Sequence, residues 1–151
     1  MKRFGWIVAG ALVIGTLDAA FAIVFWGQRG VGPIRIFQTI AAGLLGRAAF
    51  SGGLRSESLG VALHYFIAIM IVFVYWLAIR IAPALAQRTI LYGAIYGVCV
   101  YLVMNYLVIP LSATSRSPFN LSWVAWSVIV HAFLIGVPAA YFAGKAHEQD
   151  H

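Results

Sequence analysis

Long apolar runs alternate with short polar segments along the whole chain. Four runs stand out, at about Gly5–Gly27, Leu59–Ile79, Thr89–Ile109 and Leu121–Ala143. A helix of about 20 apolar residues is long enough to cross a hydrocarbon core of roughly 30 Å. The pattern therefore predicts an all-α, polytopic membrane protein with four transmembrane helices, which form a single membrane domain over residues 1–151.

The first connection, over residues 28–58, is the only long one and has a helical pattern of its own. Pro33, a residue type suited to the first turn of a helix, follows a glycine-rich turn. Apolar side chains then recur at spacings of three and four residues, and the polar side chains lie away from that stripe. The spacing predicts one interfacial amphipathic helix over about 33–50, which either seals the end of the bundle or covers a substrate.

Composition supports a membrane environment and argues against nucleic-acid binding. Hydrophobic residues make up 63% of the 151 residues and charged residues only 9%, whereas soluble domains carry about 25% charged residues. The net charge of +6 comes from Lys and Arg scattered between the apolar runs, where they suit lipid headgroups better than a phosphate backbone. The expected partners are the lipid bilayer and either a second copy of the chain or another membrane protein.

The N-terminal region has the features of a signal peptide as well as those of a first span. Lys2 and Arg3 precede an apolar stretch, and an Ala-Phe-Ala sequence at 20–22 fits a cleavage site. Apolar sequence continues beyond that site, which favours an uncleaved span. Four spans place both termini on one side, and although flanking Lys and Arg are balanced between the sides, the charges beside the first helix favour cytoplasmic termini.

Asp18 interrupts the first apolar run near its middle. Ala11, Gly15 and Ala22 lie on the same helix face, at spacings of three and four residues, and small residues let a neighbouring helix come close. A charged side chain at membrane depth must find protein or water. We therefore expect Asp18 to point into the bundle rather than into the acyl chains.

The other polar residues can be ranked by depth, at about 1.5 Å per helical residue. His131 lies level with Asp18, roughly 14–15 Å from the side of the first and third connections, whereas His64 and Asn105 lie at about 8 Å. The sequence therefore predicts two polar layers in one half of the bundle. The predicted binding residues of this half are Asp18, His131, His64, Asn105, Gln38 and Ser127.

These residues also fit purely structural roles. An Asp18–His131 contact would fix the register of two helices, and the Asn105 amide would hold helices together. The chain contains no recognisable motif for nucleophilic catalysis, phosphate binding or metal ligation, and the different depths of His64 and His131 argue against a haem between them. We expect no catalytic residues, no metal and no cofactor, which favours a protein that is not an enzyme.

The region from about Leu12 to Ala113 contains the stretches GTLDAAFA, IFQTIAAGLLGRAAFSGG, LGVALHYFIAIMIVFVYWLA and YGAIYGVCVYLVMNYLVIPLSA. In these stretches the chain resembles an uncharacterised family of small multi-pass bacterial inner-membrane proteins, a domain of unknown function. The resemblance implies a location in the bacterial inner membrane. It supplies neither an activity nor functional residues.

Three functions fit this sequence. The leading hypothesis is an oligomeric or accessory membrane component, because catalytic motifs are lacking and small residues provide many packing faces. The main alternative is a proton-coupled small-molecule transporter in which Asp18 exchanges protons and substrate. It rests on an analogy with small multidrug-resistance transporters, which have four spans and a lone acid in the first. The third is a lipid- or quinone-binding membrane protein with its ligand in the polar half.

Overall fold

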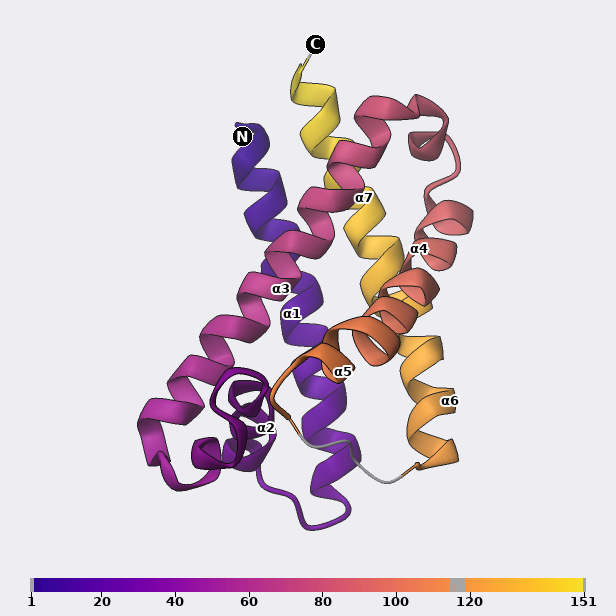
Figure 1. Ribbon diagram of the computed structural model, residues 1–151. Helices are drawn as coiled ribbons and strands as arrows, with labels where there is room; N and C mark the ends of the chain where they lie inside the picture. Colours follow the sequence, from indigo (N-terminus) through magenta and orange to yellow (C-terminus); the bar gives the residue numbers. More distant parts are fainter. Residues whose placement is uncertain (1, 115–118, 151) are drawn as a thin grey trace.

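Four long helices dominate the computed structural model, which describes residues 2–114 and 119–150 (Figure 1). They are Arg3–Gly27, Gly53–Ile81, Thr89–Leu111 and Leu121–His147, and each is long and apolar enough to cross a membrane. The described residues contain no strand. The predictions of an all-α fold and of four helices of spanning length are therefore confirmed.

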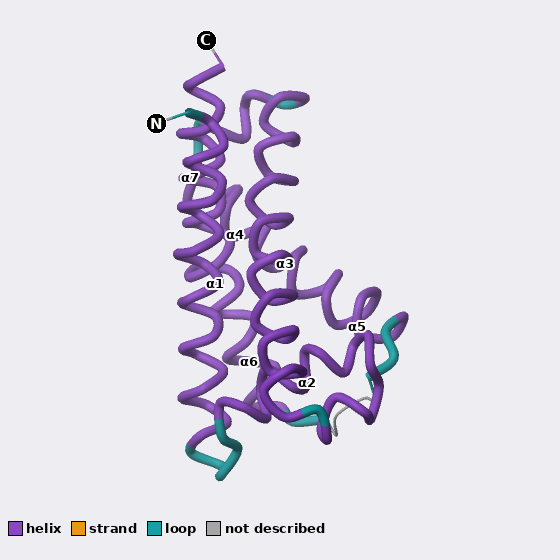
Figure 2. Tube along the Cα trace, turned by 90° about the vertical axis from the view of Figure 1, so that its left-hand side faces the viewer, coloured by secondary structure: helices purple, strands orange, loops and turns teal. Residues whose placement is uncertain are grey.

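The helices are labelled α1 (Arg3–Gly27), α3 (Gly53–Ile81), α4 (Thr89–Val103) with α5 (Ile109–Leu111), and α6 (Leu121–Val130) with α7 (Val137–His147). Successive long helices run in opposite directions, so both described ends of the chain lie at the same end of the bundle (Figures 1 and 2). Short 3₁₀ turns lie after α3, at Pro83–Ala86 (η2), and after α7, at Glu148–Asp150 (η5).

The first connection contains a shorter helix than the sequence pattern predicted. Helix α2 spans Pro33–Leu45, and a 3₁₀ segment, η1, continues over Gly46–Ser51. Gly46 and Gly53 have positive φ values of 58° and 55°, which glycine adopts without steric cost. The chain reverses direction between these glycines, so α3 begins at Gly53, well before the predicted start at Leu59.

Helix α2 is fixed against two neighbours at the end of the bundle opposite the termini (Figure 2). A Cβ atom at Gly60 of α3 would overlap the carbonyl group of Phe37, so the two helices touch at their backbones. On its other side, the Ala113 amide donates a hydrogen bond of 2.9 Å to the Gly43 carbonyl. This amphipathic helix therefore packs against α3 and the end of α5.

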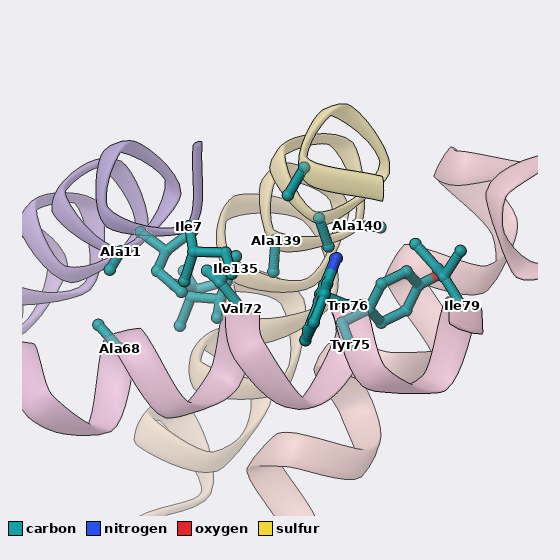
Figure 3. Packing of buried hydrophobic residues seen from close by; sticks show 14 residues of the cluster. Ile7, Ala11, Ala68, Val72, Tyr75, Trp76, Ile79, Ile135, Ala139 and Ala140 are labelled. Atoms are coloured by element: carbon teal, nitrogen blue, oxygen red, sulfur yellow. The ribbon is translucent and has the colours of Figure 1, made fainter. Parts of the chain in front are cut away.

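The end of the bundle that carries the termini has a tightly packed core, and we call it the closed half. Helices α1, α3 and α7 meet there through small and β-branched side chains, together with the aromatic rings of Tyr75 and Trp76 (Figure 3). Its buried residues are Ile7, Ala11, Ile14, Ala68, Val72, Tyr75, Trp76, Ile79, Val130, Ile135, Ala139, Ala140, Ala143 and Ala146. Alanine at helix crossings brings backbones close and leaves little space between them.

Glycines bring α4 and the last long helix into backbone contact. A Cβ atom at Gly97 would overlap the carbonyl group of His131, and one at Gly136 would overlap the Gly93 carbonyl and approach Gly97. The Gly93–Gly97 step is a small-xxx-small pattern, which allows such close crossings. The contact lies directly beside the residues that form the candidate site.

Two of the long helices contain a π-helical turn, and each turn comes shortly before a proline. The turns are Met104–Val108 (η3), ahead of Pro110, and His131–Gly136 (η4), ahead of Pro138. Proline lacks an amide hydrogen and its ring displaces the carbonyl group one turn earlier, so a locally widened helix accommodates it. Wide turns of this kind occur often at functional sites.

Candidate functional site

A cavity of about 580 Å³ lies in the half of the bundle opposite the closed half, and we call this the open half. Helices α1, α2, α3 and α6 and the two π-helical turns all contribute to its wall. Its polar lining residues are Asp18, Arg35, Thr39, His64, Tyr101, Asn105, Thr114, Asn120, Ser127 and His131. The rest of the wall is largely apolar, and drug-sized ligands occupy sites of about 300–1,000 Å³ with this character.

The structure brings together five of the six residues that the sequence assigned to the polar half. Asp18, His64, Asn105, Ser127 and His131 all line the cavity, although they come from four different long helices. The sixth predicted residue is absent from the lining. The cavity therefore brings into one volume polar residues that are spread from position 18 to position 131 of the chain.

Gln38 is the predicted site residue that lies elsewhere. Its side chain is only 6% exposed, and its Nε2 donates to the Gly53 carbonyl and the Ser56 hydroxyl, each at 3.4 Å. The hydroxyl of Ser56 donates in turn to the Gly53 carbonyl at 3.0 Å. Gln38 faces α3 rather than the cavity, because the polar positions of α2 lie on more than one face. It joins α2 to the start of α3.

Asp18 faces other helices, as the stripe of small residues on α1 predicted. The carboxylate is half-buried at the cavity wall and interacts electrostatically with the His131 ring. Within residues 2–114 and 119–150, no side chain or backbone group forms a hydrogen bond or an ion pair with it. An ionised carboxylate in an apolar surrounding requires water, a cation or hydrogen-bond donors, so the cavity must supply them.

His64 lies beside the turn of α1 that carries Asp18. Its Nε2–H donates a hydrogen bond of 2.7 Å to the Gly15 carbonyl. Gly15 lies three residues before Asp18, in the same turn of α1. The prediction of two separate polar layers is therefore wrong for His64. The reason is the early start of α3 at Gly53, which carries His64 deeper into the bundle than a helix beginning at Leu59 would.

The neighbouring residue, Tyr65, holds α3 close to α1 at this level. Its hydroxyl lies 3.0 Å from the Thr16 hydroxyl, and its ring leaves no room for a side chain at Gly15, where a Cβ atom would come within 2.9 Å. The small residue at position 15 therefore lets both His64 and Tyr65 reach α1.

His131 occupies the first position of a π-helical turn and faces the cavity. Its Nδ1–H donates to the Ser127 carbonyl at 2.8 Å, and the edge of the ring meets Tyr101, with 5.5 Å between the centroids. Because Nδ1 is turned toward its own helix, Nε2 points away from it. Nε2 is therefore available to a ligand in the cavity.

Ser127 and Asn105 complete the polar lining on this side. Ser127 is 1% exposed, and its hydroxyl has no hydrogen-bond partner among the described residues. Asn105 donates from Nδ2 to the Tyr101 carbonyl at 2.9 Å. Its side-chain oxygen takes no part in that bond. A buried hydroxyl without a partner costs about 1–3 kcal/mol, so a hydrogen-bonding group placed beside Ser127 would be stabilising.

The arrangement suits binding rather than covalent chemistry. The Ser127 hydroxyl is not hydrogen-bonded to His131, so these two residues do not form a nucleophile–base pair. Within the part of the chain that the structure describes, no group of three or more His, Cys, Asp or Glu side chains could hold a metal ion. What remains is a mostly apolar chamber with one carboxylate and several hydrogen-bonding groups.

Aromatic side chains from α1 and α6 border the cavity near the ends of these helices. The Trp26 and Trp123 rings lie 5.1 Å apart, and Phe21 stacks on Trp123 with 5.3 Å between centroids. Asn120 caps α6, where its Oδ1 accepts the Trp123 amide at 3.0 Å. Both tryptophans lie near helix ends, where amphipathic rings prefer to sit, so their positions in the sequence alone do not mark them as cavity residues.

Arg35 of α2 also borders the cavity, and it is one of the polar side chains that lie away from the apolar stripe of this helix. Its guanidinium lies 3.7 Å from the centroid of the Phe50 ring, a cation–π contact. The side chain is exposed. Its position on the cavity wall depends on how α2 is placed, so no local sequence signal could have identified it.

Comparisons of the chain with protein-family models, with curated proteins and with solved structures find no match. The resemblance to a bacterial inner-membrane family therefore stays a prediction. The interpretation of the site depends on the residues that line it and on their geometry.

Proposed function

We propose that this protein is an integral membrane protein that carries small molecules, with Asp18 exchanging protons as the ligand binds and leaves. The observation that carries the proposal is the cavity of about 580 Å³ in one half of the bundle, with an unpaired carboxylate in its wall. Intramembrane acids are costly and commonly mark substrate or proton pathways.

The charged and titratable groups around the cavity support proton exchange at Asp18. His64 from α3, His131 from the π-helical turn η4, Tyr101 from α4 and Arg35 from α2 all line the same volume as Asp18. A proton that leaves the carboxylate thus finds hydrogen-bonding groups within the cavity. The carboxylate interacts electrostatically with the His131 ring, which comes from the last long helix.

The division of the bundle into two halves supports a carrier rather than a channel. The cavity ends where the core of the closed half begins, since Ile14, Ala68 and Ile135 belong to both linings. A carrier needs such a barrier on one side of its binding site and a means to move it. The π-helical turn before Pro138 lies at this boundary, where a change of helix geometry would alter access.

The cavity also bears on the other hypotheses. An oligomeric or accessory component would need only packing faces, and it would leave a carboxylate and a buried hydroxyl without partners for no purpose. A bacterial inner-membrane location with cytoplasmic termini fits the proposal and rests on the resemblance and on the charges beside the first helix.

Transport in proteoliposomes tests the proposal. The probes are three naphthalene derivatives that cross lipid slowly: a trimethylammonium cation, a sulfonate anion and a zwitterionic amino acid. We expect an imposed pH gradient to drive uptake of at least one of them, with movement of protons reported by an internal pH dye. Asp18→Asn abolishes this uptake, whereas Glu57→Gln, which removes a carboxylate outside the cavity, retains it. Absence of protein-dependent uptake for all three probes overturns the proposal.

A further inference from the structure

We infer that the cavity of the open half binds lipophilic ammonium compounds, that is, molecules with an apolar or aromatic body and a positively charged, N–H-bearing head. The inference rests on the proposed function and names its class of ligand. It comes from the balance of hydrogen-bond donors and acceptors that the cavity presents, together with the shape and polarity of its wall.

Both imidazoles have already used the N–H that a neutral ring possesses. His64 donates from Nε2 to the Gly15 carbonyl at 2.7 Å, and His131 donates from Nδ1 to the Ser127 carbonyl at 2.8 Å. A neutral imidazole has one donor and one acceptor nitrogen. The remaining nitrogens, Nδ1 of His64 and Nε2 of His131, are therefore acceptors.

Further acceptors lie on the Asp18 side of the cavity. Asp18 offers two carboxylate oxygens that bond to no described residue, and Asn105 has used an N–H on the Tyr101 carbonyl. The Thr39 hydroxyl likewise donates a hydrogen bond of 2.8 Å to the Arg35 carbonyl. A ligand that fits this lining brings donors and positive charge.

Ser127 supplies an independent sign that the site awaits a ligand. Its hydroxyl is buried at the cavity wall and has no partner among the described residues. A hydroxyl can accept a hydrogen bond from an ammonium head as readily as it donates one. Ser127 lies one helical turn before His131, so both groups can contact the same head.

The apolar part of the wall fits the body of such a ligand. Trp26, Trp123 and Tyr101 line the cavity together with aliphatic side chains from α1, α2, α3, α4 and α5. Aromatic faces attract organic cations and pack against apolar bodies. The positive guanidinium of Arg35, which contacts Phe50, lies on α2, so an ammonium head favours the Asp18 side.

Binding to the purified protein in lipid nanodiscs tests the inference. The probes are 1-naphthylmethylamine, its N-trimethyl derivative, 1-naphthylmethanol and 1-naphthoate, measured by calorimetry at pH 7.5 against empty nanodiscs. We expect the amine to bind at least tenfold more tightly than the alcohol, and the carboxylate to bind most weakly. The trimethyl compound, which has the charge but no N–H, binds between the amine and the alcohol.

Two variants test whether the amine binds in the cavity. Asp18→Asn reduces amine affinity to the level of the alcohol, whereas Glu57→Gln, which changes the net charge equally at a residue outside the lining, leaves it unchanged. Ala22→Phe, which fills part of the cavity, weakens all probes. If Asp18→Asn does not fold, the preference of the native protein for the amine over the alcohol decides the question.

The outcomes separate this inference from the proposed function. Equal or tighter binding of the alcohol or the carboxylate, or no binding of the amine, overturns the ammonium class. If the sulfonate were then taken up in an Asp18-dependent manner, the protein would still be a carrier, but for another class of ligand. Selective amine binding without uptake of any probe overturns the carrier and leaves an ammonium-binding site.

Discussion

The closed and open halves of the bundle share the long helices α1 and α3, yet different residues lie where their helices cross. In the closed half, alanines such as Ala139 and Ala143 are fully buried at 0% exposure and bring the helices together. In the open half, Asp18, His64 and His131 occupy the corresponding inner positions and border a cavity of about 580 Å³.

The difference shows how a small four-helix bundle can make room for a site. Glycine and alanine allow backbones to touch, as Gly93, Gly97 and Gly136 do at the boundary between the halves. Larger polar side chains line the cavity beyond that boundary. The packed half thus supplies the rigid support that a binding site requires.

The largest expected effect comes from breaking the backbone contact at the boundary. Gly97→Ala places a methyl group on the His131 carbonyl, and neither backbone can move without disturbing the core. We expect a loss of about 3 kcal/mol in the free energy of unfolding, measured by denaturation in detergent micelles with tryptophan fluorescence.

Gly144→Ala is the matched control for this substitution. It lies in α7, and a Cβ atom there meets nothing within 4 Å. Since alanine stabilises a helix interior by about 0.5–1 kcal/mol relative to glycine, this variant should be as stable as the native protein or slightly more so. Equal destabilisation by both substitutions would contradict the close contact of α4 with η4.

A smaller effect distinguishes the two halves directly. Ile79 is 0% exposed in the closed core, whereas Ile36 lines the cavity and is partly exposed. Ile79→Ala leaves a new void and should cost about 2 kcal/mol. Ile36→Ala only enlarges a space that already exists and should cost less than about 1 kcal/mol. The same unfolding experiment measures both, and equal costs would mean that the open half is packed like the closed half.

The smallest expected effect concerns a single hydroxyl in each half. Ser127→Ala removes a buried hydroxyl that has no described partner, so stability should stay unchanged or rise by about 1 kcal/mol. Ala139→Ser introduces a hydroxyl at a position with 0% exposure and should cost about 1 kcal/mol. Thermal unfolding of the two variants side by side provides the comparison. A clear loss of stability in Ser127→Ala would show that its hydroxyl is satisfied in the unliganded protein.

Much of the fold could be predicted from local sequence patterns. The length of each apolar run predicts a helix of spanning length, and the interruptions at Gly30, Pro83 and Pro110 indicate where runs end. The inward direction of Asp18 follows from its small neighbours on one helix face. These properties depend on helical periodicity and on hydropathy, and both can be recognised in a sequence window of about 20 residues.

Only the tertiary structure decided how the polar residues are arranged. His64 lies beside the turn of Asp18 because two glycines with positive φ let α3 begin at Gly53. Gln38 joins α2 to α3, and Arg35 of the same helix borders the cavity instead. The sequence by itself determined that the chain forms four long apolar helices with an acid facing inward. The depth of Asp18 in the bundle, its neighbours and the cavity beside it depend on where helices begin and cross. Contacts between residues far apart in the chain determine those starts and crossings.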